Sequence, residues 1–92
     1  MKLIELMNNA HVLIKDNTKY LFSYENCIAQ WWNGVLFIVK NWEGYYCSSN
    51  STNKHLYQFI REYTCYDVYN KRDLLQLINN PKETNVLLVE RL

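Results

Sequence analysis

Apolar and polar residues alternate in short runs over the first forty positions, which is typical of β-strands. The runs are separated by pairs rich in asparagine and aspartate, the residues that favour tight turns. Residues 2–7 fit a strand or a helical turn equally well. The pattern therefore predicts four strands, at His11–Lys15, Lys19–Tyr24, Cys27–Trp32 and Val35–Lys40.

The spacing becomes helical in the second half of the chain. A first helix is expected to begin at Ser51 or Thr52, because either hydroxyl can cap it. Its apolar stripe falls at i, i+3, i+4 and i+7, on Leu56, Phe59, Ile60 and Tyr63.

Asn70 is a suitable cap for a second helix, with Asp73 three residues further on. Its predicted apolar stripe is Leu74, Leu75 and Ile78. Residues 85–90 have the composition of a strand that could join a sheet edge, although a helical turn is an open alternative. Together the elements predict one α+β domain over residues 1–92, in which four antiparallel strands, or five with the tail, are followed by two helices packed on one face.

Asn33-Gly34 is the strongest local signal, because Asn-Gly between apolar runs favours a two-residue hairpin turn. This turn places Trp32 opposite Val35 and Gln30 opposite Phe37. Alternation then divides the hairpin into two apolar faces. The first is Ile28, Gln30, Trp32, Val35, Phe37 and Val39, and the second is Cys27, Ala29, Trp31, Leu36, Ile38 and Lys40.

A one-sided antiparallel sheet normally shows one polar face, so two apolar faces need two covers. We expect the helices to cover the face of Trp32. The face of Trp31, Leu36 and Ile38 is then left either to the chain termini or to a partner molecule. Trp42, Tyr45 and Tyr46 follow this hairpin and extend the predicted partner-binding surface, since aromatic residues are enriched at protein interfaces.

Charge argues against two classes of protein. Ten basic and nine acidic residues leave a net charge of +1. A duplex-binding module usually carries a clear basic excess, and a DNA mimic needs a strongly acidic surface. Nucleic-acid binding is therefore disfavoured, although Lys54, Arg61, Lys71 and Arg72 on the helices keep it as an alternative.

Candidate chemistry is sparse. The cysteines at positions 27, 47 and 65 lack the close spacing of a zinc site or of a secreted disulfide framework, which indicates a reducing cytoplasm. A pairing of Cys47 with His55 is the one nucleophile and base combination considered, and nothing in their sequence context favours it. No stretch approaches the roughly 20 apolar residues of a membrane span. We therefore expect a cytoplasmic protein with no catalytic residues, metal site or cofactor.

Six groups of residues stand out together: Asn9-Ala10-His11-Val12, Leu21-Phe22-Ser23-Tyr24, Ile28-Ala29, Asn33-Gly34, residues 49–56 and Phe59. Together they resemble a family of small proteins, encoded by bacteriophages and mobile elements of low-GC bacteria, that carry a domain of unknown function. The likeness covers roughly residues 9–78, and its motifs are turns, caps and core positions. Ser51 stands where threonine is usual in that family, and residues 45–48 add length.

The resemblance implies a phage context, in which small proteins without enzymatic motifs are frequently inhibitors of host defence. The leading hypothesis is a non-enzymatic inhibitor of the anti-CRISPR type that occludes a Cas effector by protein contact. The predicted contact residues are Trp31, Leu36, Ile38, Trp42, Tyr45 and Tyr46. The alternatives are a small nucleic-acid-binding regulator and a homodimer whose sheets pack face to face.

Overall fold

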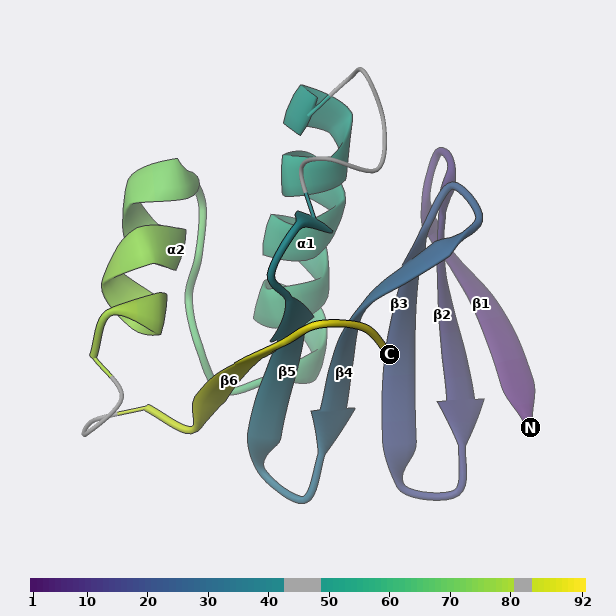
Figure 1. Ribbon diagram of the computed structural model, residues 1–92. Coiled ribbons are helices and arrows are strands. Elements are labelled where there is room, and N and C mark those ends of the chain that lie inside the picture. The colour runs from purple at the N-terminus through teal and green to yellow at the C-terminus, as the bar shows by residue number, and fades with distance from the viewer. Residues whose placement is uncertain (43–48, 81–83) are drawn as a thin grey trace.

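The computed structural model describes residues 1–42, 49–80 and 84–92. A six-stranded sheet runs in the order β1-β2-β3-β4-β5-β6, and two helices connect its last two strands (Figure 1). The fold is α+β, as predicted. The elements are β1 (Lys2–Met7), β2 (Ala10–Lys15), β3 (Thr18–Ser23), β4 (Asn26–Trp32), β5 (Val35–Val39), α1 (Ser49–Tyr63), α2 (Lys71–Ile78) and β6 (Val86–Val89).

Tight turns join the first five strands into antiparallel hairpins. Asn9, Asp16 and Asn33 have positive φ angles of 64°, 55° and 52°, a conformation that Asn and Asp adopt more readily than most residues. Gly34 follows Asn33 with a φ of 76°. The predicted turn at Asn33-Gly34 is confirmed, as are the pairs Trp32 with Val35 and Gln30 with Phe37.

β6 makes the sheet mixed rather than antiparallel, which corrects the expected four or five antiparallel strands. It pairs in parallel with β5, from Leu36 opposite Val86 to Val39 opposite Val89. The direction follows from the connection: the chain leaves β5, passes through both helices and returns to the neighbouring position, and such a crossover produces a parallel pair. β1, left open between strand and helical turn by the sequence, is the other edge strand.

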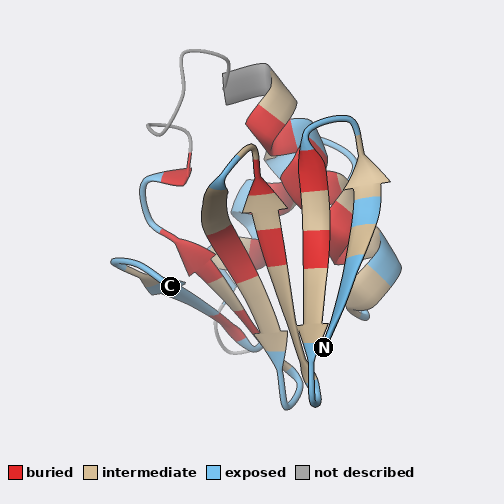
Figure 2. Cartoon of the chain, turned by 90° about the vertical axis from the view of Figure 1, so that its right-hand side faces the viewer, coloured by how far each residue is buried: buried red, intermediate tan, exposed pale blue. Residues whose placement is uncertain are grey.

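The core lies between the sheet and the helices. One ladder of directly paired residues crosses all six strands on this inner face: Ile4, Val12, Leu21, Ala29, Ile38 and Leu88. Leu56, Phe59 and Ile60 of α1 are fully buried, which confirms the predicted stripe. Figure 2, seen from the β1 side, shows buried residues on the central strands and α1, while β1 and the chain after β6 are more exposed.

α2 confirms the predicted cap and corrects the predicted stripe at Leu75 alone, because Ile78 packs against the core as expected. The backbone N–H of Asp73 donates to Asn70 Oδ1 at 2.9 Å. Leu74 and Leu77 are buried, whereas Leu75 is 41% exposed. Leu77 belongs to the same core cluster as Leu74 and Val86. It lies three positions after Leu74 and so shares its helix face, whereas Leu75 points away from that face.

The helices cover the opposite face from the one predicted. Trp31, Leu36 and Ile38 lie on the inner face, and Trp32 lies on the other. The residues on neighbouring strands explain the difference. Ile38 pairs with Ala29, and Ala29 pairs with Leu21, so this row of the inner face is apolar. The row that contains Trp32 continues instead into two polar residues, Thr18 and Lys15.

A bulge in β4 changes the alternation within the strand. Leu21 pairs with Ala29, but Phe22 pairs with Cys27, so Ile28 is an extra residue. Ile28 and Ala29 are both fully buried in the core. The prediction that Ile28 shares a face with Trp32 is therefore wrong, because a bulge reverses the alternation beyond it.

Candidate functional site

Three of the predicted contact residues belong to the inner face. Leu36 and Ile38 have no exposed surface. Trp31 is half-buried against the core, and its ring meets the Tyr66 ring edge-on with centroids 6.3 Å apart. In this conformation Leu36 and Ile38 offer no surface to a partner, so the partner-facing role predicted for this face is corrected to a core role.

The aromatic residues after β5 divide into two groups. Trp42 is buried in the core, and its indole Nε1–H donates to Asn53 Oδ1 at 2.8 Å. The Nζ atom of Lys71 lies 5.6 Å from the centre of the Trp42 ring. Trp42 thus ties the start of α1 and α2 to the sheet. Tyr45 and Tyr46 lie outside the described residues.

The outer face of the sheet, opposite the helices, carries a second ladder across all six strands. Its members are paired directly from strand to strand: Leu3, Leu13, Tyr20, Gln30, Phe37 and Leu87. The edge members Leu3 and Leu87 are 64% and 54% exposed, and the four between them are half-buried. Five of the six side chains are apolar or aromatic, so this face is an apolar surface without a covering helix.

Two further rows flank this ladder on the outer face. One contains Lys15, Thr18, Trp32 and Val35, and the other contains Glu5, His11, Phe22 and Cys27. Trp32 is 48% exposed although it is one of the largest side chains in the chain. Charges of both signs, on Lys15 and Glu5, lie at the ends of these rows. An apolar centre with a polar rim is the usual anatomy of a protein-binding surface.

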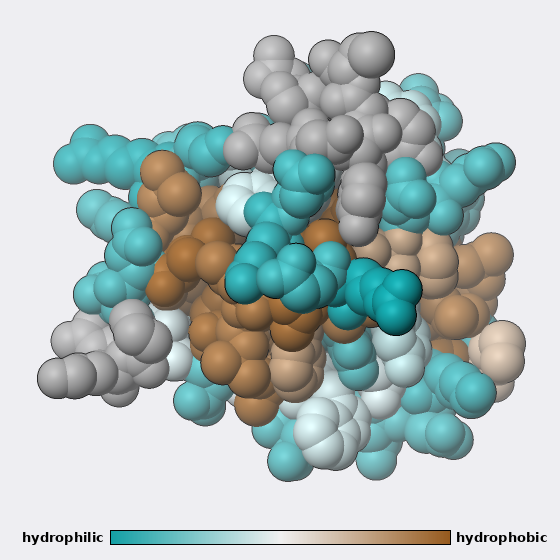
Figure 3. Space-filling view, in the orientation of Figure 1, coloured by the Kyte–Doolittle hydropathy of each residue, from teal (hydrophilic) through white to brown (hydrophobic). Residues whose placement is uncertain are grey.

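The segment after β6 crosses part of this outer face. In Figure 1 it passes in front of the sheet while α1 lies behind. Figure 3 shows hydrophobic surface gathered over this face, with hydrophilic atoms lying across its middle. Leu92 joins Leu13, Tyr20, Phe22 and Cys27 in lining a groove of about 360 Å³.

Cys27 in this groove is a weak nucleophile. Burial raises the pKa of its thiol to about 11, and the Sγ contact with the Ala29 carbonyl opposes that rise only in part. A thiol with such a pKa is protonated at neutral pH, and the thiolate is the reactive form. Cys27 therefore contributes apolar surface to the groove rather than chemistry.

A buried polar cluster lies where α1 meets the turns at one end of the sheet. Ser23 Oγ lies 2.8 Å from His55 Nδ1 and 3.2 Å from Thr52 Oγ1. His55 Nε2 lies 3.0 Å from the backbone carbonyl of Asn8. A carbonyl can only accept, so Nε2 carries the proton and neutral His55 accepts the Ser23 hydroxyl hydrogen at Nδ1. Burial lowers the pKa of His55, which favours this neutral form.

This cluster has the atoms of a serine–histidine pair but not the access that a nucleophile needs. Ser23 has no exposed surface and His55 is 3% exposed. Its role is to join three segments: the β1–β2 turn, the end of β3 and the first half of α1. The sequence suggested Cys47 as the only partner for His55, and Cys47 lies outside the described residues. Ser23 was not predicted as a partner of His55.

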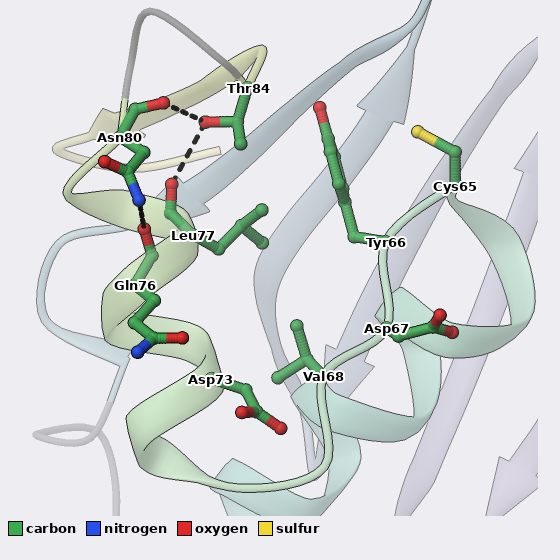
Figure 4. A pocket seen from close by; sticks show the side chains of 9 residues that line it. All are labelled: Cys65, Tyr66, Asp67, Val68, Asp73, Gln76, Leu77, Asn80 and Thr84. Atoms are coloured by element: carbon green, nitrogen blue, oxygen red, sulfur yellow. Dashed lines mark hydrogen bonds between the residues drawn. The ribbon is translucent and has the colours of Figure 1, made fainter.

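A second cavity, of about 310 Å³, lies between α2 and the connection from α1 (Figure 4). Its polar groups already hold the end of α2. Thr84 Oγ1 lies 3.0 Å from the carbonyl of Leu77 and 2.9 Å from that of Asn80, and Asn80 Nδ2 donates to the Gln76 carbonyl at 2.9 Å. The backbone N–H of Asn85 donates to the Tyr66 hydroxyl. These contacts make the cavity a feature of helix termination, and the outer face remains the better candidate.

The described residues contain no group of three or more His, Cys, Asp or Glu side chains placed to hold a metal ion. No helix in the described ranges is long and apolar enough to cross a membrane. Comparison of the chain with family models, with curated proteins and with solved structures gives no match.

Proposed function

We propose that this chain is a small non-enzymatic protein that binds another protein through the outer face of its sheet and thereby blocks that protein. The observation that carries the proposal is the outer ladder from Leu3 to Leu87, with the half-exposed Trp32 beside it. Large apolar side chains contribute roughly 1.5–3 kcal/mol each when fully buried. Burying Leu3, Trp32 and Leu87 under a partner would therefore stabilise a complex substantially.

The family resemblance supports a particular role for this binding. It points to a phage-encoded inhibitor of a host defence system, of the anti-CRISPR type, that acts in the host cytoplasm by occluding a Cas effector. Segments that carry the resemblance supply Ser23, Thr52 and His55, which pack together inside the fold. The resemblance thus supports a common scaffold and genomic context, while the outer face supplies the contact surface of this chain.

A plating assay tests the proposal. The chain is expressed in a host whose CRISPR–Cas system targets a phage, and the efficiency of plating is measured with wild type, Trp32→Asp and Leu75→Asp. Trp32 and Leu75 are similarly exposed, but Leu75 lies on α2. Wild type and Leu75→Asp should restore plaques, and Trp32→Asp should lose at least about ten-fold of that protection, because tryptophans are among the residues that contribute most to binding at interfaces.

Two outcomes would count against the proposal in different ways. Equal protection by Trp32→Asp would remove the outer face from the interaction, provided that circular dichroism shows all three proteins folded. Failure of the wild type to protect against any of the CRISPR–Cas types tested would remove the defence role. A protein-binding role through the outer face would then be tested by photocrosslinking from position 32.

A second candidate function is binding of single-stranded nucleic acid, favoured by the rings of Tyr20, Phe22, Trp32 and Phe37 on the outer face. Aromatic rings on a sheet can stack bases, but such sites also line the backbone path with basic residues. Among the basic residues considered on the helices, Arg61 donates to the Val68 carbonyl and to Gln58 and lies over the Tyr69 ring. Fluorescence anisotropy with a labelled oligonucleotide at low salt is the test, and an absence of binding removes this candidate.

A further inference from the structure

One apolar side chain from the segment after β6, that of Leu92, borders the groove on the outer face. Its floor is formed by Leu13, Tyr20, Phe22 and Cys27, which come from three neighbouring strands. Leu92 lies against it but remains 41% exposed. Leu92 therefore covers one side of the groove, and about 360 Å³ beside it stays open to a further side chain.

Residues 90–92 are held to this face by few contacts. The Lys40 backbone N–H donates to the Val89 carbonyl at 2.8 Å, which fixes the end of β6. Beyond that point the Lys40 Nζ atom pairs with Glu90 Oε1 at 2.9 Å, and both side chains are largely exposed. Exposed ion pairs are weak, and ordering of the segment opposes its docking. The segment can therefore be displaced by a competitor.

We propose that the groove is a receptor for an extended segment of a partner protein that carries an acidic residue followed, two positions later, by an aliphatic one. Residues 90–92 lie along one side of the groove in the free protein and act as an internal competitor. The chemistry is that of the chain's own segment at this site: Glu90 pairs with Lys40, and Leu92 borders the groove. Lys15, at the rim, adds a second positive charge that favours an acidic segment. This inference rests on the proposed function, because it describes what the outer face recognises.

An internal competitor lowers the apparent affinity for any external one. A short flexible tether gives an effective concentration on the order of millimolar. If the segment is docked about nine-tenths of the time, releasing it raises the apparent affinity for an external ligand about ten-fold. Release of the segment should therefore strengthen binding at the groove.

The probe for this inference is a synthetic peptide with the sequence of residues 87–92. It is titrated into the wild-type protein and into the full-length double variant Glu90→Lys, Leu92→Asp, whose own segment is released. Binding is followed by the NMR resonances of Tyr20 and Phe22. The released variant should bind the peptide about ten-fold more tightly than wild type. A peptide with aspartate in place of its last leucine should not bind.

Two further variants locate the binding. Adding Leu13→Asp to the released protein should abolish peptide binding, whereas adding Leu75→Asp on α2 should leave it unchanged. If Leu13→Asp fails to fold, the aspartate peptide still decides whether the aliphatic side chain is recognised. Equal affinity for the wild-type and released proteins, equal binding of the two peptides, or no shift at Tyr20 and Phe22 at millimolar peptide would each overturn the inference.

Other outcomes separate this inference from the proposed function. If the peptide does not bind while Trp32→Asp still abolishes protection in the plating assay, the outer face keeps its role and the groove loses its assigned ligand. If a single-stranded oligonucleotide, rather than the peptide, shifts Tyr20 and Phe22 more strongly in the released protein, the groove belongs to a nucleic acid. That result would overturn the peptide assignment.

Discussion

The two faces of the sheet are both apolar, but they differ in what lies over them. On the inner face, Leu21 and Ile38 are fully buried beneath the helices. On the outer face, Leu3 and Leu87 keep more than half of their surface exposed. The same six strands build both ladders. The difference between the faces therefore comes from which residues are paired across the strands in each row, more than from any single strand.

This contrast shows why a hairpin alone does not reveal its own core side. Trp31 and Trp32 are equally apolar neighbours, and only their rows distinguish them. The Trp31 row continues to Leu36 and Val86 on one side and to Lys19 and Ile14 on the other, whereas the Trp32 row runs into Thr18 and Lys15. The inner ladder beside Trp31, from Ile4 to Leu88, is apolar along its whole width. A helix packs best over such a row, because that arrangement buries the fewest polar groups without partners.

The largest effect on stability is expected when one leucine from each face is replaced and the two variants are compared. Leu21→Ala should lower the free energy of unfolding by about 3 kcal/mol, because it opens a cavity in the core. Leu3→Ala should lower it by less than about 0.5 kcal/mol, since that side chain is mostly exposed. Urea denaturation followed by circular dichroism measures both. Similar losses for the two variants would show that the outer face is as much a core as the inner one.

The polar cluster gives the next largest effect. Ser23→Ala should cost about 2 kcal/mol, because it leaves His55 Nδ1 buried without a donor. The same denaturation experiment measures it, with His11→Gln on the outer face as a matched polar control. A loss no greater than that of the control would mean that the cluster does not hold α1 to the sheet.

His55 also predicts a pH dependence. The unfolded chain takes up a proton on this residue near the ordinary pKa of 6.5, but the folded protein resists protonation until a lower pH. Below pH 6.5 the unfolded state therefore binds more protons, and stability falls as the pH drops, by at most about 1.4 kcal/mol per pH unit. Denaturation midpoints between pH 7 and pH 5 should fall for wild type. His55→Gln should flatten that part of the curve.

The helix cap supplies a smaller effect that leaves the outer face untouched. Asn70→Ala should cost about 1 kcal/mol, because it removes the acceptor for the Asp73 N–H. Thermal denaturation measures the loss, and Asn79→Ala, at the other end of α2, is the control. Protection in the plating assay should persist in both variants. Loss of protection without loss of folding would place part of the binding surface on α2.

Local signals in the sequence predicted much of the fold. The Asn33-Gly34 turn, the Asn70 cap and the α1 stripe each depend on a few neighbouring residues, and all three are confirmed. The bulge at Ile28 and the parallel pairing of β6 depend on contacts between strands, which no short stretch of sequence contains.

The candidate site was harder to predict for the same reason. The sequence correctly indicated a surplus of apolar sheet surface near Trp31 and Trp32. The predicted exposed face was that of Trp31, whereas the exposed face is that of Trp32. The polar residues Thr18 and Lys15 can be placed in the Trp32 row only once the register of three strands is known. The pairing of Ser23 with His55 likewise joins positions 32 residues apart.

The most direct test of the outer face as the binding surface is site-specific photocrosslinking in a host with active defence. A photoreactive amino acid is placed at Trp32 on the outer face, or at Leu75 on α2, two positions of similar exposure. The account predicts a discrete crosslinked partner from position 32 that is absent, or far weaker, from position 75. A partner captured from position 75 and not from position 32 would contradict it.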